Sequence, residues 1–199
     1  CGPETRRGLD WKRKKLEAEE AGALLLTEGD YRLAADMAEA VRSNRAAAEL
    51  LSGDLVCEAS IFAKDPSTGV EMRCRPDGWR RDIGALIDLK TTIASDPEGF
   101  AKQCANLGYH IQDMFYRRCM ENAGFEVDRF IFIAVQKTRP HLVGIYELDW
   151  ASLDEGKAAV EYALEKYRKA SESNEWGYDF GDLKTIQIPR YSFKFSQID

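Results

Sequence analysis

The segment RCRPDGWRRDIGALIDLKTT, residues 73–92, constrains the fold more than any other part of the sequence. Two of its acids, Asp77 and Asp88, lie eleven positions apart, each in or next to a short apolar or β-prone run, and Lys90 follows Asp88 by two. A carboxylate is costly to bury unless it is paired or binds a metal. The β-prone runs place the two acids and the lysine on adjacent strands. We therefore expect them either to be surface residues or to form a site that holds a cationic group.

The length and composition favour one globular domain over residues 1–199, with a substantial core. Hydrophobic residues make up 44% and charged residues 31%, which is ordinary for a soluble protein. Five cysteines without a CxxC pair, beside two histidines, argue against a disulfide framework or a zinc site. We expect reduced thiols in a bacterial or phage-infected cytoplasm, no membrane contact, and a natural start upstream of Cys1.

The net charge of −6 argues against DNA binding by diffuse attraction, because nucleic-acid binders are usually basic. It still allows a local basic groove. It also allows a site where metal ions bridge protein acids to phosphate.

Periodicity predicts a mixed α/β fold, in which a central mixed sheet is flanked by helices. Helices are expected at 9–22, 28–51, from Pro97 after a cap at Ser95 or Asp96, 109–122 and 152–172. Strands are expected at 56–63, 70–74, 85–89, 129–136 and 143–148, with the first two joined by the turn KDPSTG. The tail is expected to form a strand and a packing arm.

The acids and the lysine suggest metal chemistry. Mg²⁺ takes hard oxygen ligands, usually one or two carboxylates with water and substrate phosphate. Asp77 and Asp88 could supply them, and Lys90 faces the same side of its strand as Asp88, where it could orient water or offset phosphate charge. Glu58 could add a third acid. Gln112 and Tyr116, four apart on one helix face, could contact phosphate or hold Lys90.

Each of these signals is weak alone. PDG is a common turn, and D-x-K is often a solvated strand face. Glu58 could be a surface residue, Gln112 and Tyr116 the polar edge of an amphipathic helix, and His110 a hydrogen-bonded structural residue. The combination in this order on these elements is much harder to obtain by chance.

Four blocks carry a resemblance to a known family: CEASIF with Glu58, RCRPDG with Asp77, IDLKTT with Asp88 and Lys90, and GYHIQDMFY with Gln112 and Tyr116. From about Tyr31 to the tail, the sequence resembles the PD-(D/E)XK nucleases. Within them it is more similar to the RecE-type exonucleases (exodeoxyribonuclease VIII), which are relatives of lambda exonuclease. The resemblance implies a restriction-endonuclease-like core.

The resemblance also implies an activity and roles for residues. The activity is hydrolysis of double-stranded DNA from 5′ ends with Mg²⁺, for which Mn²⁺ could substitute. Partners would be a single-strand annealing protein and further copies in a ring around DNA. Asp77, Asp88 and the Leu89 carbonyl would hold the metal, Lys90 would position water, and Glu58 would bind a second metal or that water. Gln112 and Tyr116 would support the site, and the expected DNA contacts are Arg73, Arg75, Arg80 and His110.

One feature departs from the family pattern. The family usually has an upstream helix with a functional histidine, and no residue before Tyr31 matches it. We therefore expect either that an N-terminal helix is missing from this chain or that the site is incomplete, and we favour the missing helix. Two alternatives stay open: a catalytically silent nuclease-fold domain that binds a recombination partner, and an endonuclease of the same superfamily.

Overall fold

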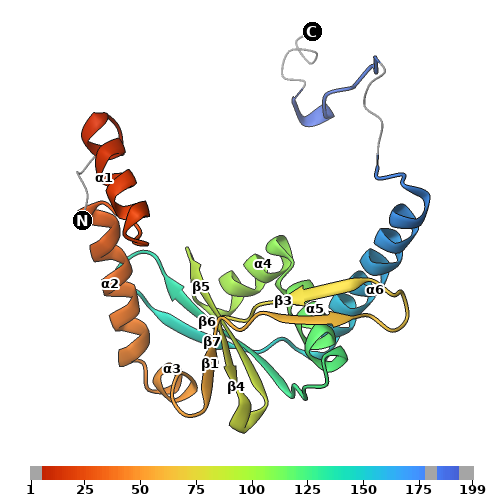
Figure 1. The fold of residues 1–199 in the computed structure, drawn as a ribbon, viewed down its shortest axis with the longest axis horizontal. Coiled ribbons are helices and arrows are strands. Elements are labelled where there is room, and N and C mark those ends of the chain that lie inside the picture. The colour runs from red at the N-terminus through yellow and green to blue at the C-terminus, as the bar shows by residue number, and fades with distance from the viewer. Residues whose placement is uncertain (1–5, 178–182, 193–199) are drawn as a thin grey trace.

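The computed structural model describes residues 6–177 and 183–192. These residues form a five-stranded sheet in the order β1-β4-β5-β6-β7 and a separate β2-β3 hairpin (Figure 1). The strands are β1 Leu55–Cys57, β2 Ile61–Lys64, β3 Glu71–Cys74, β4 Gly78–Arg80, β5 Ala85–Thr92, β6 Arg129–Gln136 and β7 Val143–Tyr146. The helices are α1 Leu9–Glu20, α2 Glu28–Ser43, α3 Arg45–Leu50, α4 Pro97–Leu107, α5 Tyr109–Asn122 and α6 Trp150–Ser173, with short 3₁₀ turns at Arg81–Ile83 and Arg190–Ser192.

The five-stranded sheet has a core on each face. On one face, residues of α4, α5 and α6 pack against Leu86, Phe130 and Phe132. On the other face, α2 and α3 contribute Val41 and Ala47 to a smaller core. This is the mixed sheet flanked by helices that the sequence predicts.

Strand β5 distributes its side chains between the two faces with a period of two. Leu86 belongs to the core under α4–α6, whereas Ile87 belongs to the core under α2 and α3. Asp88 and Lys90 share the Leu86 face and therefore point toward α5. The local strand pattern thus decides which helix can reach the two charged side chains.

A helical crossover joins β5 to its parallel neighbour β6. Asp96 caps α4 by accepting a hydrogen bond from the Gly99 amide at 2.9 Å, as predicted, and Pro97 occupies the first turn. Gly108 ends α4 at a φ of 68°, a left-handed conformation that glycine adopts without strain. Helix α5 begins at the next residue, so its first turns lie over the sheet beside β5.

The β2-β3 hairpin is attached to α5 through the buried side chain of Asp65. Its Oδ1 accepts hydrogen bonds from Ser67 Oγ at 2.6 Å and from the Thr68 amide at 2.9 Å, which closes the turn. Its Oδ2 accepts a hydrogen bond from Arg118 of α5 at 2.5 Å. Burial alone would raise the pKa of Asp65, but the bonds from Arg118, Ser67 and Thr68 outweigh it and lower the pKa.

The structure corrects two predicted elements. The expected strand 56–63 is interrupted at Glu58, whose φ is 56°, so β1 joins the large sheet and β2 joins the hairpin. The expected helix 28–51 is divided at Asn44, which ends α2 and caps α3 by accepting the Ala47 amide at 3.0 Å. Thr27 caps α2 as predicted.

Two further differences concern β4 and the tail. Strand β4, which has three residues, was not predicted as a separate strand. In the tail, residues 183–189 form no strand, and residues 193–199 lie outside the described part of the chain. Of the helices within 6–177 and 183–192, none combines the length and the apolar character that crossing a bilayer requires.

Asp65 should be important for stability, because it links the hairpin turn to α5. Replacing Asp65 with Ala removes the nearer of the two acids beside the largely buried Arg118 guanidinium, the other being Glu161 at 3.9 Å, and we expect a loss of about 3 kcal/mol in the free energy of unfolding. Urea denaturation of both proteins measures this. Asp10→Ala is the control, because its pair with Arg13 is exposed and should contribute nothing measurable. Equal stability of Asp65→Ala and wild type would contradict the assignment.

Candidate metal-dependent active site

Asp88 is the centre of a small polar cluster on the helical face of β5. Its side chain is only 4% exposed. Lys90 Nζ lies 2.6 Å from its Oδ2, and the Gln112 amide donates to its Oδ1 at 2.6 Å. Lys90 in turn donates to Gln112 Oε1 at 3.0 Å. The three side chains therefore form a closed triangle between β5 and α5.

The environment raises the pKa of Asp88. Burial is the largest cause, since it disfavours the charged form. The nearby Lys90 and the Gln112 hydrogen bond oppose this rise, whereas the negative charge of Asp77 adds to it. The Asp77 charge thus acts on Asp88, as expected for two acids on neighbouring strands that face one site.

Asp77 directly precedes β4, which pairs antiparallel with β5 so that Gly78 lies opposite Ile87. Its Oδ2 accepts a hydrogen bond from the Leu89 amide at 2.8 Å. The side chain is therefore oriented by the backbone between Asp88 and Lys90. This arrangement answers the question raised by the sequence: the two acids are brought together at one end of the β4-β5 pair.

Tyr109 belongs to the site, although the sequence argument missed it. Lys90 Nζ lies 4.5 Å from the centre of the Tyr109 ring, in a cation–π contact. The Tyr109 hydroxyl accepts a hydrogen bond from Gln103 of α4 at 3.2 Å. The available signal was its position in the quoted block GYHIQDMFY, three residues before Gln112 on the same helix face.

Tyr116 and Glu58 lie at the periphery of this cluster. Burial, and after it the charge of Asp88, raise the pKa of Tyr116, whose hydroxyl lies 3.5 Å from the Arg75 carbonyl oxygen. The Glu58 amide donates to the Asp77 carbonyl at 3.2 Å, so the backbones are adjacent. The Glu58 side chain is exposed and pairs with Arg75 at 2.9 Å. Its role as a ligand stays a prediction.

The residues expected to contact DNA differ in their exposure. Arg73 and Arg75 are exposed on and just after β3. The expectation for Arg80 is wrong, because this side chain is buried, pairs with Asp82 at 2.7 Å and donates to the Glu49 carbonyl at 2.7 Å. It also packs against Gly53, where an added Cβ would lie 2.8 Å from Arg80 Nη2.

His110 is also placed away from the Asp88 cluster. It lines a cavity of about 400 Å³ against α6, together with Asp149 and Glu155. Its carbonyl oxygen would lie 2.3 Å from a Cβ added at Gly156, so the backbones are in close contact. The structure therefore favours the alternative assignment of His110 as a structural residue.

The cluster fits a hard divalent cation. Asp88 Oδ2 is buried and accepts no well-formed hydrogen bond, although the Lys90 ammonium lies 2.6 Å from it as an ion-pair partner. A buried oxygen with unused acceptor capacity, next to a second oriented carboxylate, suits Mg²⁺ or Mn²⁺. Within residues 6–177 and 183–192, no three His, Cys, Asp or Glu side chains form an all-protein metal cluster. A site completed by water and phosphate is compatible with that.

Comparisons with known proteins bear on the family and the fold of this chain. The profile of the family described as "PDDEXK-like domain of unknown function (DUF3799)" matches residues 12–187. No curated protein matches significantly. The nuclease superfamily named in this description has acids and a lysine as its namesake motif, as the sequence resemblance implied; the RecE-type subgroup is not distinguished by this match.

Solved structures show a similar fold at low sequence identity. A protein from Eubacterium rectale described as "Putative exonuclease" is 15% identical with a TM-score of 0.60, and the match covers 90% of this chain and 71% of that one. A phage-related exonuclease from Haemophilus somnus 129PT is 16% identical with a TM-score of 0.43, covering 84% and 74%. The first supports the fold.

The raised pKa of Asp88 predicts a stability cost at neutral pH. An acid whose pKa is higher in the folded state loses stability as the pH rises from its ordinary value through the raised one. Asp88→Asn mimics the neutral acid, so in EDTA its stability relative to wild type should be greater at pH 7 than at pH 3.5. Urea denaturation at both pH values measures this. If the stability of Asp88→Asn relative to wild type stays constant or falls as the pH rises, burial does not destabilise the charged form of Asp88.

Proposed function

The chain belongs to the PDDEXK-like family described above, and on that premise we propose that it is a metal-dependent exonuclease that hydrolyses double-stranded DNA from its ends. The observation that carries the proposal is the triangle of Asp88, Lys90 and Gln112 with Asp77 beside it. A buried carboxylate costs free energy even when it is paired, as Asp88 is with Lys90 at 2.6 Å, so we infer that its place beside Asp77 serves a function, for which metal binding is the candidate.

Asp77, Asp88 and the Leu89 carbonyl would hold Mg²⁺, and Glu58 would reach a second metal or the attacking water. Bound there, the metal would supply a charge that stabilises the phosphate transition state and activates water. Lys90 is fixed by Gln112 and the Tyr109 ring, so its ammonium is positioned in advance to orient water or offset phosphate charge.

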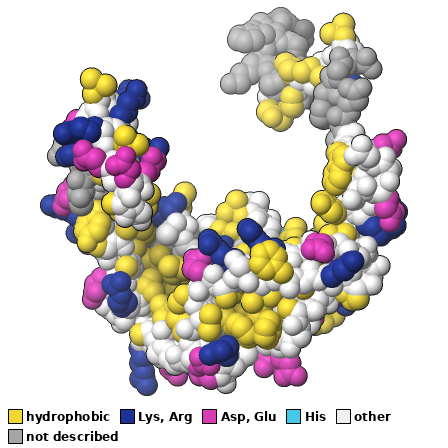
Figure 2. Space-filling model, in the orientation of Figure 1, with side chains coloured by type: hydrophobic (Ala, Val, Ile, Leu, Met, Phe, Trp, Pro, Cys, Tyr) yellow, Lys and Arg dark blue, Asp and Glu magenta, His cyan; other side chains and the backbone are white. Residues whose placement is uncertain are grey.

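The molecule has a hollow that a nucleic acid could enter. Figure 2 shows a hollow between α1 and α2 on one side and α6 on the other, with Lys and Arg side chains on α1 and over the sheet. Arg73 and Arg75 are the remaining candidates for phosphate contacts near the site. Local cations of this kind are compatible with a net charge of −6, because phosphate contacts act at short range in salt.

The finer parts of the proposal rest on the sequence resemblance. They are 5′ to 3′ polarity, a role in recombination with a single-strand annealing partner, and a ring of several copies around DNA. The description of the Eubacterium rectale protein as an exonuclease supports an end-directed activity.

The central test is digestion of end-labelled linear duplex and of covalently closed circular duplex. With Mg²⁺ we expect the linear DNA to be degraded and the circle to survive, and EDTA should abolish cleavage. Asp88→Asn should reduce the rate by on the order of 10³-fold or more, because it removes metal anchoring. The matched control is Asp154→Asn on the exposed surface of α6, which should retain the wild-type rate.

Three outcomes would count against parts of this proposal. Cleavage of the circle at the linear rate would identify an endonuclease. A full rate for Asp88→Asn would refute the site. No cleavage with Mg²⁺ or Mn²⁺, in a folded protein, would favour the silent nuclease-fold alternative.

Lys90 should act in catalysis without holding the metal. Lys90→Ala should lower the rate by on the order of a hundredfold and preserve most Mg²⁺ binding, since an ammonium is not a ligand. Calorimetric titration with Mg²⁺ beside the rate measurement separates the two effects. Lys102→Ala is the control, because this lysine forms an exposed pair with Glu98 on α4. Loss of Mg²⁺ binding in Lys90→Ala would make Lys90 a structural residue.

A further inference from the structure

The tail after α6 carries apolar side chains that the fold does not cover. Leu183 is fully exposed, Ile186 is 84% exposed, Ile188 56% and Tyr191 87%. Ile186 and Ile188 alternate with Thr185 and Gln187, so residues 185–188 have the period of a strand with an apolar face, whereas Leu183 and Tyr191 fall on the opposite face. A set of exposed apolar side chains in a strand pattern indicates a segment that binds a surface.

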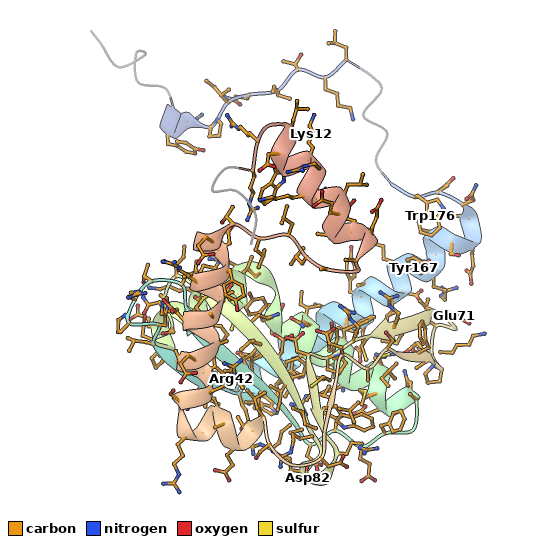
Figure 3. The ribbon with its side chains drawn as sticks, turned by 60° about the vertical axis from the view of Figure 1, so that its left-hand side comes forward. Lys12, Arg42, Glu71, Asp82, Tyr167 and Trp176 are labelled. Atoms are coloured by element: carbon orange, nitrogen blue, oxygen red, sulfur yellow. The ribbon has the colours of Figure 1, made fainter. Side chains whose placement is uncertain are left out.

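An apolar groove of about 640 Å³ lies beside α6, the helix that leads into this tail. Its walls come from the start of β3, from the α4–α5 junction with Ile111 and Phe115, and from α6 with Leu164 and Tyr167. Figure 3 labels Glu71 and Tyr167, which both line this groove, one on β3 and one on α6. The groove is thus open, mostly apolar and formed in part by the helix that carries the tail.

The groove also borders an open strand edge. Among the described residues, β3 pairs with β2 alone, so half of its backbone N–H and C=O groups point away from β2. Such an edge readily accepts an additional strand. The start of β3, at Val70 and Glu71, lines the groove, so an added strand would place its apolar face against Phe115 and Leu164.

We propose that residues 183–191 dock in this groove as a third strand on β3 of the same chain. The docked segment would cover its own isoleucines and pair the open edge of the hairpin at once. In the structure these residues stand away from the groove, so docking is a movement of the tail onto a surface that is already formed (Figure 1).

The chain is long enough for the tail to bind in cis. Leu183 lies six residues after Gly177, which spans up to about 20 Å when extended. Tyr167 lies six residues before the end of α6 at Ser173, or about 9 Å along the helix. The tail can therefore turn back along α6, and its attachment gives it a high effective concentration at the groove.

Docking of the tail would affect the candidate active site through Gln112. This residue lines the groove and also bonds Asp88 and Lys90. The docked tail would lie against the wall that holds the catalytic triangle in place. The inference itself needs neither DNA nor metal, so its test does not depend on the proposed function.

The test compares two full-length double variants by hydrogen–deuterium exchange. Ile186→Asp with Ile188→Asp places charges on the apolar face, and Thr185→Asp with Gln187→Asp places the same charges on the opposite face. We expect the β3 amides that do not bond to β2 to exchange faster in the first variant, by on the order of tenfold, and at the wild-type rate in the second. Equal exchange in all three proteins would overturn the proposal.

Measurements at two protein concentrations distinguish a tail that docks on its own chain from a tail that docks on a second copy. Protection of β3 in wild type should be the same at low and high concentration, with a monomeric mass by light scattering under the low-concentration condition. Protection that is lost on dilution together with a multimeric mass would show that the tail binds another copy, and would overturn docking in cis.

Discussion

The burial of one carboxylate in a central strand is the constraint on which the site depends. Asp88 has almost no contact with water, and an isolated charge there would be very unfavourable. Lys90 on β5 and Gln112 on α5 both reduce the free-energy cost of burying this charge. Helix α5 must therefore stand over β5 with its first turns at this point, and the break at Gly108 allows that.

The crossover between β5 and β6 serves the core and the site together. A parallel connection needs a long segment, and here α4 and α5 supply it. The same helices bury Phe100 and Met120 in the core and present Tyr109 and Gln112 to Lys90. The site residues are thus held by packed secondary structure, which limits their motion and favours a catalyst prepared before substrate binds.

Much of the fold follows from local patterns, and the rest depends on long-range contacts. Helix α5 and strand β6 were predicted with the bounds observed, because the apolar period and the flanking glycines indicate the same bounds there. The break at Glu58 was not predicted, because it arises from pairing β1 and β2 with different partners. Asp77, Asp88 and Lys90 were found through spacing and family resemblance. The burial of Arg80 and the contact of Tyr109 depend on residues distant in sequence, Glu49 and Lys90.

The charge of the whole chain bears on how such a site could treat DNA. With six more acids than bases, the average field repels a polyanion. Two carboxylates in the candidate site would add to that repulsion unless a cation lay between them and the phosphate. Affinity for DNA and affinity for the metal are then coupled, since each would neutralise charge that opposes the other. If the protein acts on DNA as proposed, the overall acidity, which first argued against a nucleic-acid partner, is a reason to expect that it depends on a metal.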